Sequence, residues 1–258
     1  MQSIYSKAEE LKAQQQKAAI CVVVETKGST PRKQGAKMIV FDNGTIYGSI
    51  GGGSVEKEVA VKAVEQIISG TPAKYSFTLE EDLGMHCGGY MEVYIEPITQ
   101  TQKLYIFGAG HVGRALAKFA IDLDFEITLI DPRENIFADN SFAQYTCVNK
   151  DYFEAIDEIV FNDNSYFVIV TPKHTNDEAI LEKIAKKPSA YIGMIGSTRK
   201  VDLIKKRFIE EKILNKEELD KIDMPIGIPF LVETPQEIAV SIVAKLIDIR
   251  NKLKKKEK

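Results

Sequence analysis

A short apolar strand that runs directly into a glycine turn and a helix limits the fold of this chain more than any other feature. Residues 104–107 (LYIF) form the strand, and residues 108–113 carry the pattern G-x-G-x-x-G. Such a turn predicts a Rossmann-like unit. Gly108 permits the tight turn, Gly110 lets a diphosphate approach the backbone, and Gly113 allows close packing of helix on strand. Because the motif starts near residue 104, roughly a hundred residues of another kind precede it.

Apolar runs and helical periodicity alternate after the glycine turn. Strands are expected over residues 104–107, 126–130, 145–148, 166–171 and 190–195, and helices over 111–122, 176–187 and 198–211. This order predicts a doubly wound, mostly parallel sheet. A last helix begins at Thr234, with Pro235 at its first position and Glu237 completing a capping box.

The first hundred residues predict a separate α+β domain. The pattern indicates a helix over 3–16, a buried strand over 18–25, a hairpin around Asn43-Gly44, a helix over 54–69, and strands over 74–78 and 90–96. The polar run 99–103 (TQTQK) indicates a linker. We therefore expect one domain over residues 1–99 and a second over residues 103–258.

The composition excludes several classes of protein. With 258 residues, 44% of them hydrophobic and 28% charged, the chain has the balance of an ordinary soluble globular protein. A net charge of −3 gives no reason to expect nucleic acid as a partner. No apolar run approaches the roughly 20 residues of a membrane span. The three scattered cysteines form no disulfide framework, so a cytoplasmic location is expected.

Charged residues at the carboxyl ends of predicted strands are candidates for ligand binding in the second half. Asp131 follows the glycine turn at the distance expected of an acid that binds a ribose. Arg133 leaves the preference between NAD and NADP open. Arg199 opens a helix directly after a strand, where a bound anion would offset its unfavourable position in the helix dipole. His174 also follows a strand, which makes it a candidate proton donor.

Two loops in the first half offer groups that can bind an anion. One carries Arg32 and Lys33, with Lys37 just beyond it. The other, Gly51-Gly52-Gly53, places bare backbone amides at a helix N-terminus, where they can cradle an anion. Each loop alone is compatible with a simple tight turn.

A third loop holds the cysteine with the most exposed setting. Cys87 lies beside His86 among glycines, and a neighbouring histidine can favour the thiolate, the form that attacks or binds metal. Cys21 and Cys147, in contrast, lie in apolar strands and are expected to be inert core residues. Three such loops within a hundred residues favour a binding surface over three unrelated turns.

Seven motifs taken together resemble the XdhC/CoxI family of accessory proteins for molybdenum hydroxylases such as xanthine dehydrogenase. The motifs are GSTPRKQGAKM (28–38), GSIGGGSVE (48–56), EDLGMHCGG (81–89), FGAGHVGRALA (107–117), DPR (131–133), AYIGMIGSTRK (190–200) and ETPQEIAVSI (233–242). They occur in the family's order and cover nearly the whole chain. The resemblance implies an N-terminal XdhC-type domain followed by a C-terminal Rossmann domain.

The resemblance also implies a function and a ligand. The two domains would bind molybdenum cofactor, protect it, and help deliver its sulfurated form to a molybdenum hydroxylase apoenzyme, with a cysteine desulfurase as a further partner. The phosphate of molybdopterin, alone or extended by a nucleotide, suits Gly51–Gly53 or the cations Arg32, Lys33 and Lys37. The soft metal suits Cys87, as its ligand or as a guard of the terminal sulfur. Amphipathic helices at both ends of the chain lead us to expect a homodimer.

Two other functions stay open at this point. In a nicotinamide-dependent oxidoreductase, residues 104–200 would hold NAD(P) and His174 would donate a proton. In a non-catalytic sensor, dinucleotide binding to the second half would bias a protein contact. The oxidoreductase leaves the first hundred residues without a role, so an accessory factor that is not itself a catalyst is favoured.

Overall fold

The structure is a computed structural model that describes residues 2–79, 89–172 and 176–256, with side chains through residue 253. The described residues divide into two compact units at the junction of Thr101 and Gln102.

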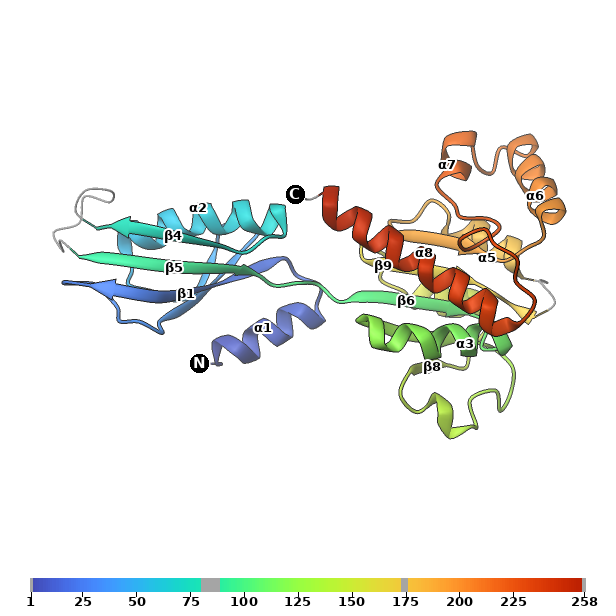
Figure 1. Cartoon of the computed structure of the whole chain (residues 1–258), viewed down its shortest axis with the longest axis horizontal. Helices are drawn as coiled ribbons and strands as arrows, with labels where there is room; N and C mark the ends of the chain where they lie inside the picture. The colour runs from blue at the N-terminus through green and yellow to red at the C-terminus, as the bar shows by residue number, and fades with distance from the viewer. Residues whose placement is uncertain (1, 80–88, 173–175, 257–258) are drawn as a thin grey trace. The chain divides into compact units, whose positions relative to one another are not determined.

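An antiparallel five-stranded sheet forms the N-terminal unit, with the strand order β3-β2-β1-β5-β4 (Figure 1). Two helices pack against it. Strand β1 is central, and it pairs with β2 on one side and β5 on the other. The elements are α1 (Ile4–Ala13), β1 (Ala18–Lys27), β2 (Lys37–Phe41), β3 (Ile46–Gly48), α2 (Gly53–Ser69), β4 (Ala73–Thr78) and β5 (Tyr90–Pro97).

Alternation along the strands separates the two faces of this sheet. Cys21 and Val23 of β1 pack with Val55 and Val59 of α2 in one core. Ala18 of β1 and Ile39 of β2, which point to the other face, pack with α1 in a second, smaller core. Side chains two residues apart share a face of a strand, so α1 and α2 cover opposite faces.

A parallel five-stranded sheet forms the C-terminal unit, with the strand order β10-β9-β6-β7-β8. The chain begins at the central strand β6, moves outward through β7 and β8, and returns to place β9 on the other side of β6. The elements are β6 (Gln102–Phe107), α3 (His111–Ala120), a 3-10 turn η1 (Ile121–Leu123), β7 (Phe125–Ile130), a second turn η2 (Asn140–Phe142), β8 (Thr146–Val148), α4 (Tyr152–Glu158), β9 (Ser165–Ile169), α5 (Asp177–Ile184), β10 (Tyr191–Met194), α6 (Thr198–Glu210), α7 (Lys216–Asp220) and α8 (Pro235–Lys256).

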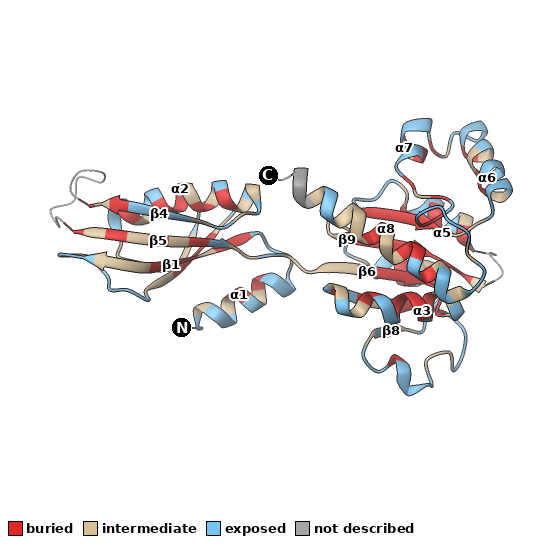
Figure 2. Ribbon diagram, in the orientation of Figure 1, coloured by how far each residue is buried: buried red, intermediate tan, exposed pale blue. Residues whose placement is uncertain are grey.

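Helices cover both faces of the parallel sheet. One core joins the sheet to α3 and α8, and the other joins it to α4, α5 and α6. All five residues of β9 are buried, as are the last four of β6 (Figure 2). The predicted doubly wound fold is confirmed. In such a sheet, ligands bind outside the carboxyl ends of the strands where the strand order reverses, which here is between β6 and β9.

The structure differs from the predicted elements at three places. Helices α4 and α7 were not predicted, because each is so short that no helical period of apolar residues develops. Strand β6 starts at Gln102, inside the predicted linker, because Gln102 and Lys103 extend the ladder with β7. The predicted capping box of α8 is confirmed: Glu237 accepts from the Thr234 amide at 2.9 Å and donates its own amide to Thr234 Oγ1 at 3.3 Å.

A membrane span needs a long and predominantly apolar helix. None of the helices in the described part of the chain meets both conditions.

Candidate functional site

The first two loops that the sequence singled out in the N-terminal unit, and Gly89 at the described end of the third, lie together at one end of its sheet. A Cβ atom on Gly51 would lie 2.8 Å from Cβ of Pro31, so the glycine turn packs directly against the first loop. A Cβ on Gly89 would lie 2.1 Å from the carbonyl oxygen of Ser29. Gly89 ends the third loop, and its carbonyl accepts from the Leu79 amide at 2.9 Å. The described ends of all three loops therefore adjoin one another.

A carboxylate already fills the glycine turn. Glu56, in the first turn of α2, accepts hydrogen bonds at Oε1 from the amides of Ile50, Gly51 and Gly52, at 3.0, 3.2 and 2.8 Å. The Ser49 hydroxyl donates a fourth at 2.7 Å. Burial acts to raise the pKa of Glu56, but these hydrogen bonds outweigh it and hold that pKa below its ordinary value. The turn is thus built to surround an anion, and an external anion would have to displace Glu56 from these amides.

The cations predicted to accompany this turn differ in how they are engaged. Arg32 and Lys33 are exposed, and their side chains form no ion pair with the residues that the structure describes. Lys37 is half-buried, donates to the Gly35 carbonyl at 3.0 Å, and lies 5.6 Å from the ring centroid of Tyr5. Arg32 and Lys33 are therefore the cations available to a ligand. Cys87 lies outside the described residues, and its predicted role stays a prediction.

In the glycine turn of the C-terminal unit, a Cβ atom would have room at one glycine and would clash at the other two. A Cβ on Gly113 would lie 1.9 Å from the carbonyl oxygen of Gly108, and one on Gly108 would lie 2.4 Å from the carbonyl oxygen of Val170. The contact at Gly113 agrees with the close packing of helix on strand expected there, and the φ of +110° at Gly108 agrees with the tight turn expected there. The nearest atom to a Cβ on Gly110 is Nη2 of Arg133, at 3.8 Å. Gly110 also precedes the first amides of α3, which have no partner within the helix.

Asp131, the predicted ribose-binding acid, is fully buried and fully engaged. Its Oδ2 accepts from the Ala109 amide and from Nη2 of Arg133, each at 2.8 Å. Its Oδ1 accepts from the amide and Nε of Arg133, at 3.1 and 2.9 Å. Burial acts to raise the pKa of Asp131, but the hydrogen bonds from Arg133 and Ala109 hold it below its ordinary value. Asp131 therefore holds Arg133 beside the glycine turn and has no free oxygen for a ribose.

A second buried acid stands at the end of the neighbouring strand. Asp177, at the start of α5, accepts from the Thr171 hydroxyl at 2.5 Å and from the Thr171 amide at 3.2 Å. Nζ of Lys200 lies 3.8 Å from its Oδ2. A fully buried acid paired with a partly exposed cation thus lies on each side of the place between β6 and β9 where the strand order reverses.

Tyr152 contributes a buried hydroxyl without a hydrogen-bond partner near the same strand ends. The residue is 1% exposed, and its ring packs edge-on against Phe107, which directly precedes the glycine turn. Burial raises the pKa of Tyr152 well above its ordinary value, and the charge of Asp131 adds to this rise while that of Arg133 opposes it. A buried polar atom without a partner is destabilising by about 1–3 kcal/mol, so it marks a place to examine for function. Sequence reasoning missed this residue because it lies on the unpredicted helix α4.

Of the two remaining predicted residues of this unit, the structure describes only Arg199. Arg199 is exposed at the start of α6 and makes no ion pair with the described residues. Its neighbour Ser197 caps that helix by accepting from the Lys200 amide at 3.3 Å. His174 lies outside the described residues.

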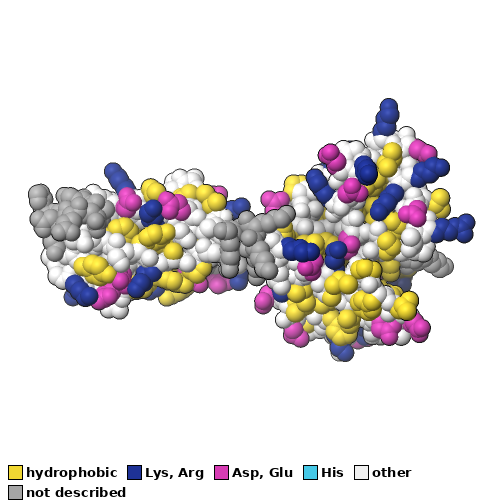
Figure 3. All heavy atoms as spheres, turned by 45° about the horizontal axis from the view of Figure 1, so that its top comes forward, with side chains coloured by type: hydrophobic (Ala, Val, Ile, Leu, Met, Phe, Trp, Pro, Cys, Tyr) yellow, Lys and Arg dark blue, Asp and Glu magenta, His cyan; other side chains and the backbone are white. Residues whose placement is uncertain are grey.

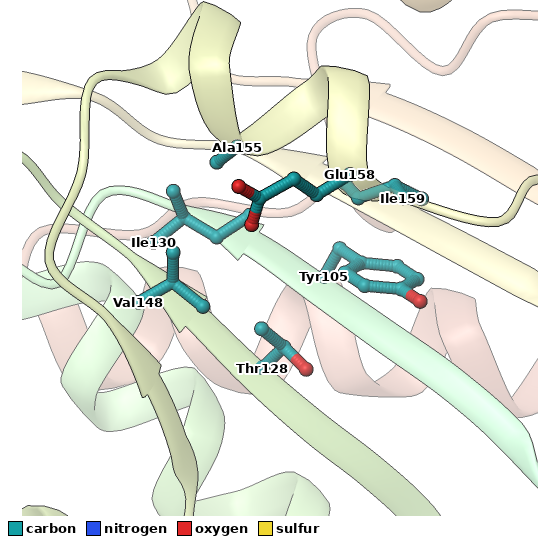
Figure 4. Close-up of a pocket in the computed structure, with 7 residues that line it drawn as sticks. All are labelled: Tyr105, Thr128, Ile130, Val148, Ala155, Glu158 and Ile159. Atoms are coloured by element: carbon teal, nitrogen blue, oxygen red, sulfur yellow. The ribbon is translucent and has the colours of Figure 1, made fainter.

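Two hollows in the C-terminal unit lie away from the glycine turn. One, of about 160 Å³, is lined mainly by apolar side chains of β6, β7, β8 and α4, with Glu158 lying over it from α4 (Figure 4). A carboxylate above an apolar floor does not suit a phosphate. The other, of about 250 Å³, is lined by residues around η2 and by Cys147. Cys147 is half-buried, so it is less enclosed than predicted, whereas Cys21 is fully buried as predicted.

Basic and acidic side chains are interspersed over the visible face of both units (Figure 3). The residues described by the structure contain no cluster of three or more His, Cys, Asp or Glu side chains placed to hold a metal ion. The favoured sites are therefore the two glycine turns with their neighbouring cations.

Comparison with known proteins assigns the chain to a family. A model of the XdhC Rossmann domain matches residues 104–246, and a model of the XdhC and CoxI family matches residues 11–78. The chain belongs to the XdhC family. The resemblance drawn from the seven motifs is confirmed, and so is the order of the N-terminal α+β domain and the C-terminal Rossmann domain.

Relatives of the XdhC chain extend over both units. It is 32% identical to the uncharacterized protein YqeB of Escherichia coli (strain K12), over 96% of this chain but only 46% of that protein. The chain thus spans about half the length of this relative. It is 22% identical to a probable xanthine dehydrogenase subunit of Bacillus subtilis (strain 168), over 98% of this chain and 99% of that one. The crystal structure of a xanthine dehydrogenase from Bacillus halodurans shares the fold, with a TM-score of 0.51 and 21% identity over 97% of this chain and 96% of that one.

Proposed function

We propose that this XdhC-family chain is an accessory factor that binds molybdenum cofactor and helps to deliver it to a xanthine dehydrogenase-type molybdenum hydroxylase. The observation that carries the proposal is the match of both family domains, in order, within one chain. Relatives along nearly the whole chain whose names refer to xanthine dehydrogenase support it. Sulfuration of the cofactor, with a cysteine desulfurase as sulfur donor, and pairing of two copies of the chain belong to the same proposal.

The N-terminal unit fits the phosphate end of such a cofactor. The amides of Gly51 and Gly52 already surround one carboxylate, which shows that the turn accommodates an anion. Pro31 packs against Gly51, so the adjacent Arg32 and Lys33 belong to the same end of the sheet. A phosphate would be held by these cations, and by the glycine amides once Glu56 moves away.

The metal end of the cofactor is assigned to Cys87. A thiolate is a soft ligand that suits molybdenum. When bound, the cofactor carries the redox-active metal that the target hydroxylase needs. The chain itself would hold the phosphate, orient the pterin and shield the metal from water until transfer.

Purification from a host that makes molybdenum cofactor tests the proposal. Bound pterin is oxidised to its fluorescent product and measured together with molybdenum in the purified protein. We expect both in the wild type, and less of both in Cys87→Ser and in the double variant of Arg32 and Lys33 to Ala. Cys147→Ser is the matched control, because it removes a half-buried thiol that belongs to the C-terminal unit. Absence of pterin and metal from the wild type would contradict the proposal.

An NAD(P)-dependent oxidoreductase is the second candidate. The open position at Gly110 beside the first amides of α3 favours it. Substrate-dependent oxidation of reduced nicotinamide, followed by absorbance, is the test. Turnover with a small alcohol or hydroxy acid would replace the accessory role with a catalytic one.

A further inference from the structure

In the described part of the C-terminal sheet, the acid placed to recognise a ribose diol is already paired. In a dinucleotide-binding Rossmann fold, a free acid after the second strand accepts hydrogen bonds from the ribose hydroxyls. Asp131 holds that position, but each of its two oxygens already accepts two hydrogen bonds, from Ala109 and Arg133. Because its side chain is also fully buried, a diol would have to break this pairing.

A cation stands where the diol would lie. The Arg133 side chain is 44% exposed and points over Gly110, with Nη2 3.8 Å from the place of a Cβ there. Its Nε and Nη2 donate hydrogen bonds to Asp131, whereas Nη1 donates to no residue in the described part of the chain. Guanidinium groups bind phosphate through paired N–H donors. The first amides of α3 add further donors at the positive end of the helix dipole.

The Tyr152 hydroxyl is a further polar group near these strand ends. It is buried and has no hydrogen-bond partner among the described residues, and its ring lies edge-on to Phe107, the residue before the glycine turn, with the ring centroids 6.2 Å apart. Because no described residue accepts from it, the donor is left over for a ligand or for water that arrives with one.

We infer that the glycine turn at Gly110 binds a phosphomonoester and not an unmodified ribose diol. Arg133 and the first amides of α3 hold the phosphate, Tyr152 supplies a buried donor near the same strand ends, and Asp131 acts as a positioning residue that fixes the guanidinium. Two ligands present this group. The first is the 2′-phosphate of a dinucleotide such as NADPH. The second is the phosphate of the pterin cofactor, and this alternative rests on the proposed function.

Calorimetric titration of the full chain with NADPH, NADH, 2′,5′-ADP and 5′-AMP tests the dinucleotide alternative. We expect NADPH to bind at least tenfold more tightly than NADH, and 2′,5′-ADP more tightly than 5′-AMP. Arg133→Gln should remove this preference. Arg207→Gln is the matched control, because Arg207 is 43% exposed on α6 and pairs with Glu178 and Glu211 and not with Asp131. Thermal unfolding confirms that both variants are folded.

Tyr152→Phe separates a ligand donor from a structural residue. Since it removes an unpaired buried hydroxyl, it should leave the unfolding temperature unchanged or raise it, yet weaken binding of 2′,5′-ADP by about threefold or more. A loss of stability without a loss of binding would show that the hydroxyl serves the fold and overturn its assignment.

Retention of pterin by the Arg133→Gln and Arg207→Gln proteins tests the second alternative. If NADPH and NADH bind equally but Arg133→Gln alone loses pterin, the phosphate belongs to the pterin cofactor and the inference holds. If Arg133→Gln changes neither dinucleotide binding nor pterin retention, the inference is overturned. That result leaves the proposed function intact, because Cys87 and the N-terminal cations test it separately.

Discussion

The carboxylate of Glu56 accepts a 2.8 Å hydrogen bond from the backbone amide of Gly52, four residues earlier in the chain. This contact closes the glycine turn onto the first turn of α2, and Ser49 and the next two amides complete the shell. The arrangement satisfies backbone donors of the turn that leads into the helix. It also places a negative charge where the helix dipole favours one.

We therefore predict that Glu56→Gln lowers the free energy of unfolding by about 1–3 kcal/mol, the range for hydrogen bonds to a charged group. Denaturant titration provides the measurement. Glu58→Gln is the matched control, since Glu58 is exposed on the same helix, and its effect should stay within about 0.5 kcal/mol. Equal effects of the two substitutions would show that the shell around Glu56 contributes nothing.

The same residue predicts a dependence of stability on pH. The folded protein holds the pKa of Glu56 below its ordinary value of 4.5, so the charged form is favoured by folding. Its contribution is complete above the ordinary pKa and is lost as pH falls through the lowered one. Unfolding curves of the wild type and Glu56→Gln should therefore converge in acid. A difference that stays constant down to the lowest pH at which the protein folds would contradict this.

Two Asp–Arg pairs in the C-terminal unit differ in burial, and they should differ in energy. The Asp131 side chain is fully buried beneath Arg133, whereas Asp139 is 51% exposed beside Arg114. Asp131→Ala leaves the buried Ala109 amide without its acceptor, whereas Arg133 stays 44% exposed, so the substitution should cost about 1–3 kcal/mol. Asp139→Ala should cost no more than about 1 kcal/mol. Chemical denaturation of both variants decides the matter, and similar losses would refute the distinction.

Two glycines of the Rossmann turn should respond oppositely to alanine. A Cβ on Gly113 would lie 1.9 Å from a backbone oxygen, so helix and strand would have to separate and the unfolding temperature should fall sharply. A Cβ on Gly110 meets nothing closer than 3.8 Å, so Gly110→Ala should fold normally. It should nevertheless weaken ligand binding, because the methyl group would stand where a phosphate approaches the backbone. Unchanged affinity in a folded Gly110→Ala protein would argue against a ligand at this turn.

The sequence predicted the fold well because its signals were local and repeated. The strand before Gly108 and the Asn43-Gly44 hairpin each follow from a few neighbouring residues. The site was harder to predict, because its character depends on contacts between segments. The spacing of the residues does not reveal that the Arg133 side chain pairs with Asp131. It also does not reveal that the Glu56 carboxylate accepts hydrogen bonds from the amides of Gly51 and Gly52. Tyr152 carries no motif at all, and only the packed structure shows its unpaired hydroxyl.

The cysteines offer a last test, which compares thiol reactivity across the chain. Cys21, a residue of β1, is fully buried in the core formed with α2, and burial raises its pKa to about 12. Only the thiolate reacts with iodoacetamide, so Cys21 should stay unmodified at neutral pH until the protein unfolds. Cys147 is half-buried beside a hollow and should react faster, although burial raises its pKa as well. Mass spectrometry of the Cys87→Ser protein, which retains only these two thiols, gives the order directly. Modification of Cys21 as fast as Cys147 in the folded protein would mean that the N-terminal core opens readily.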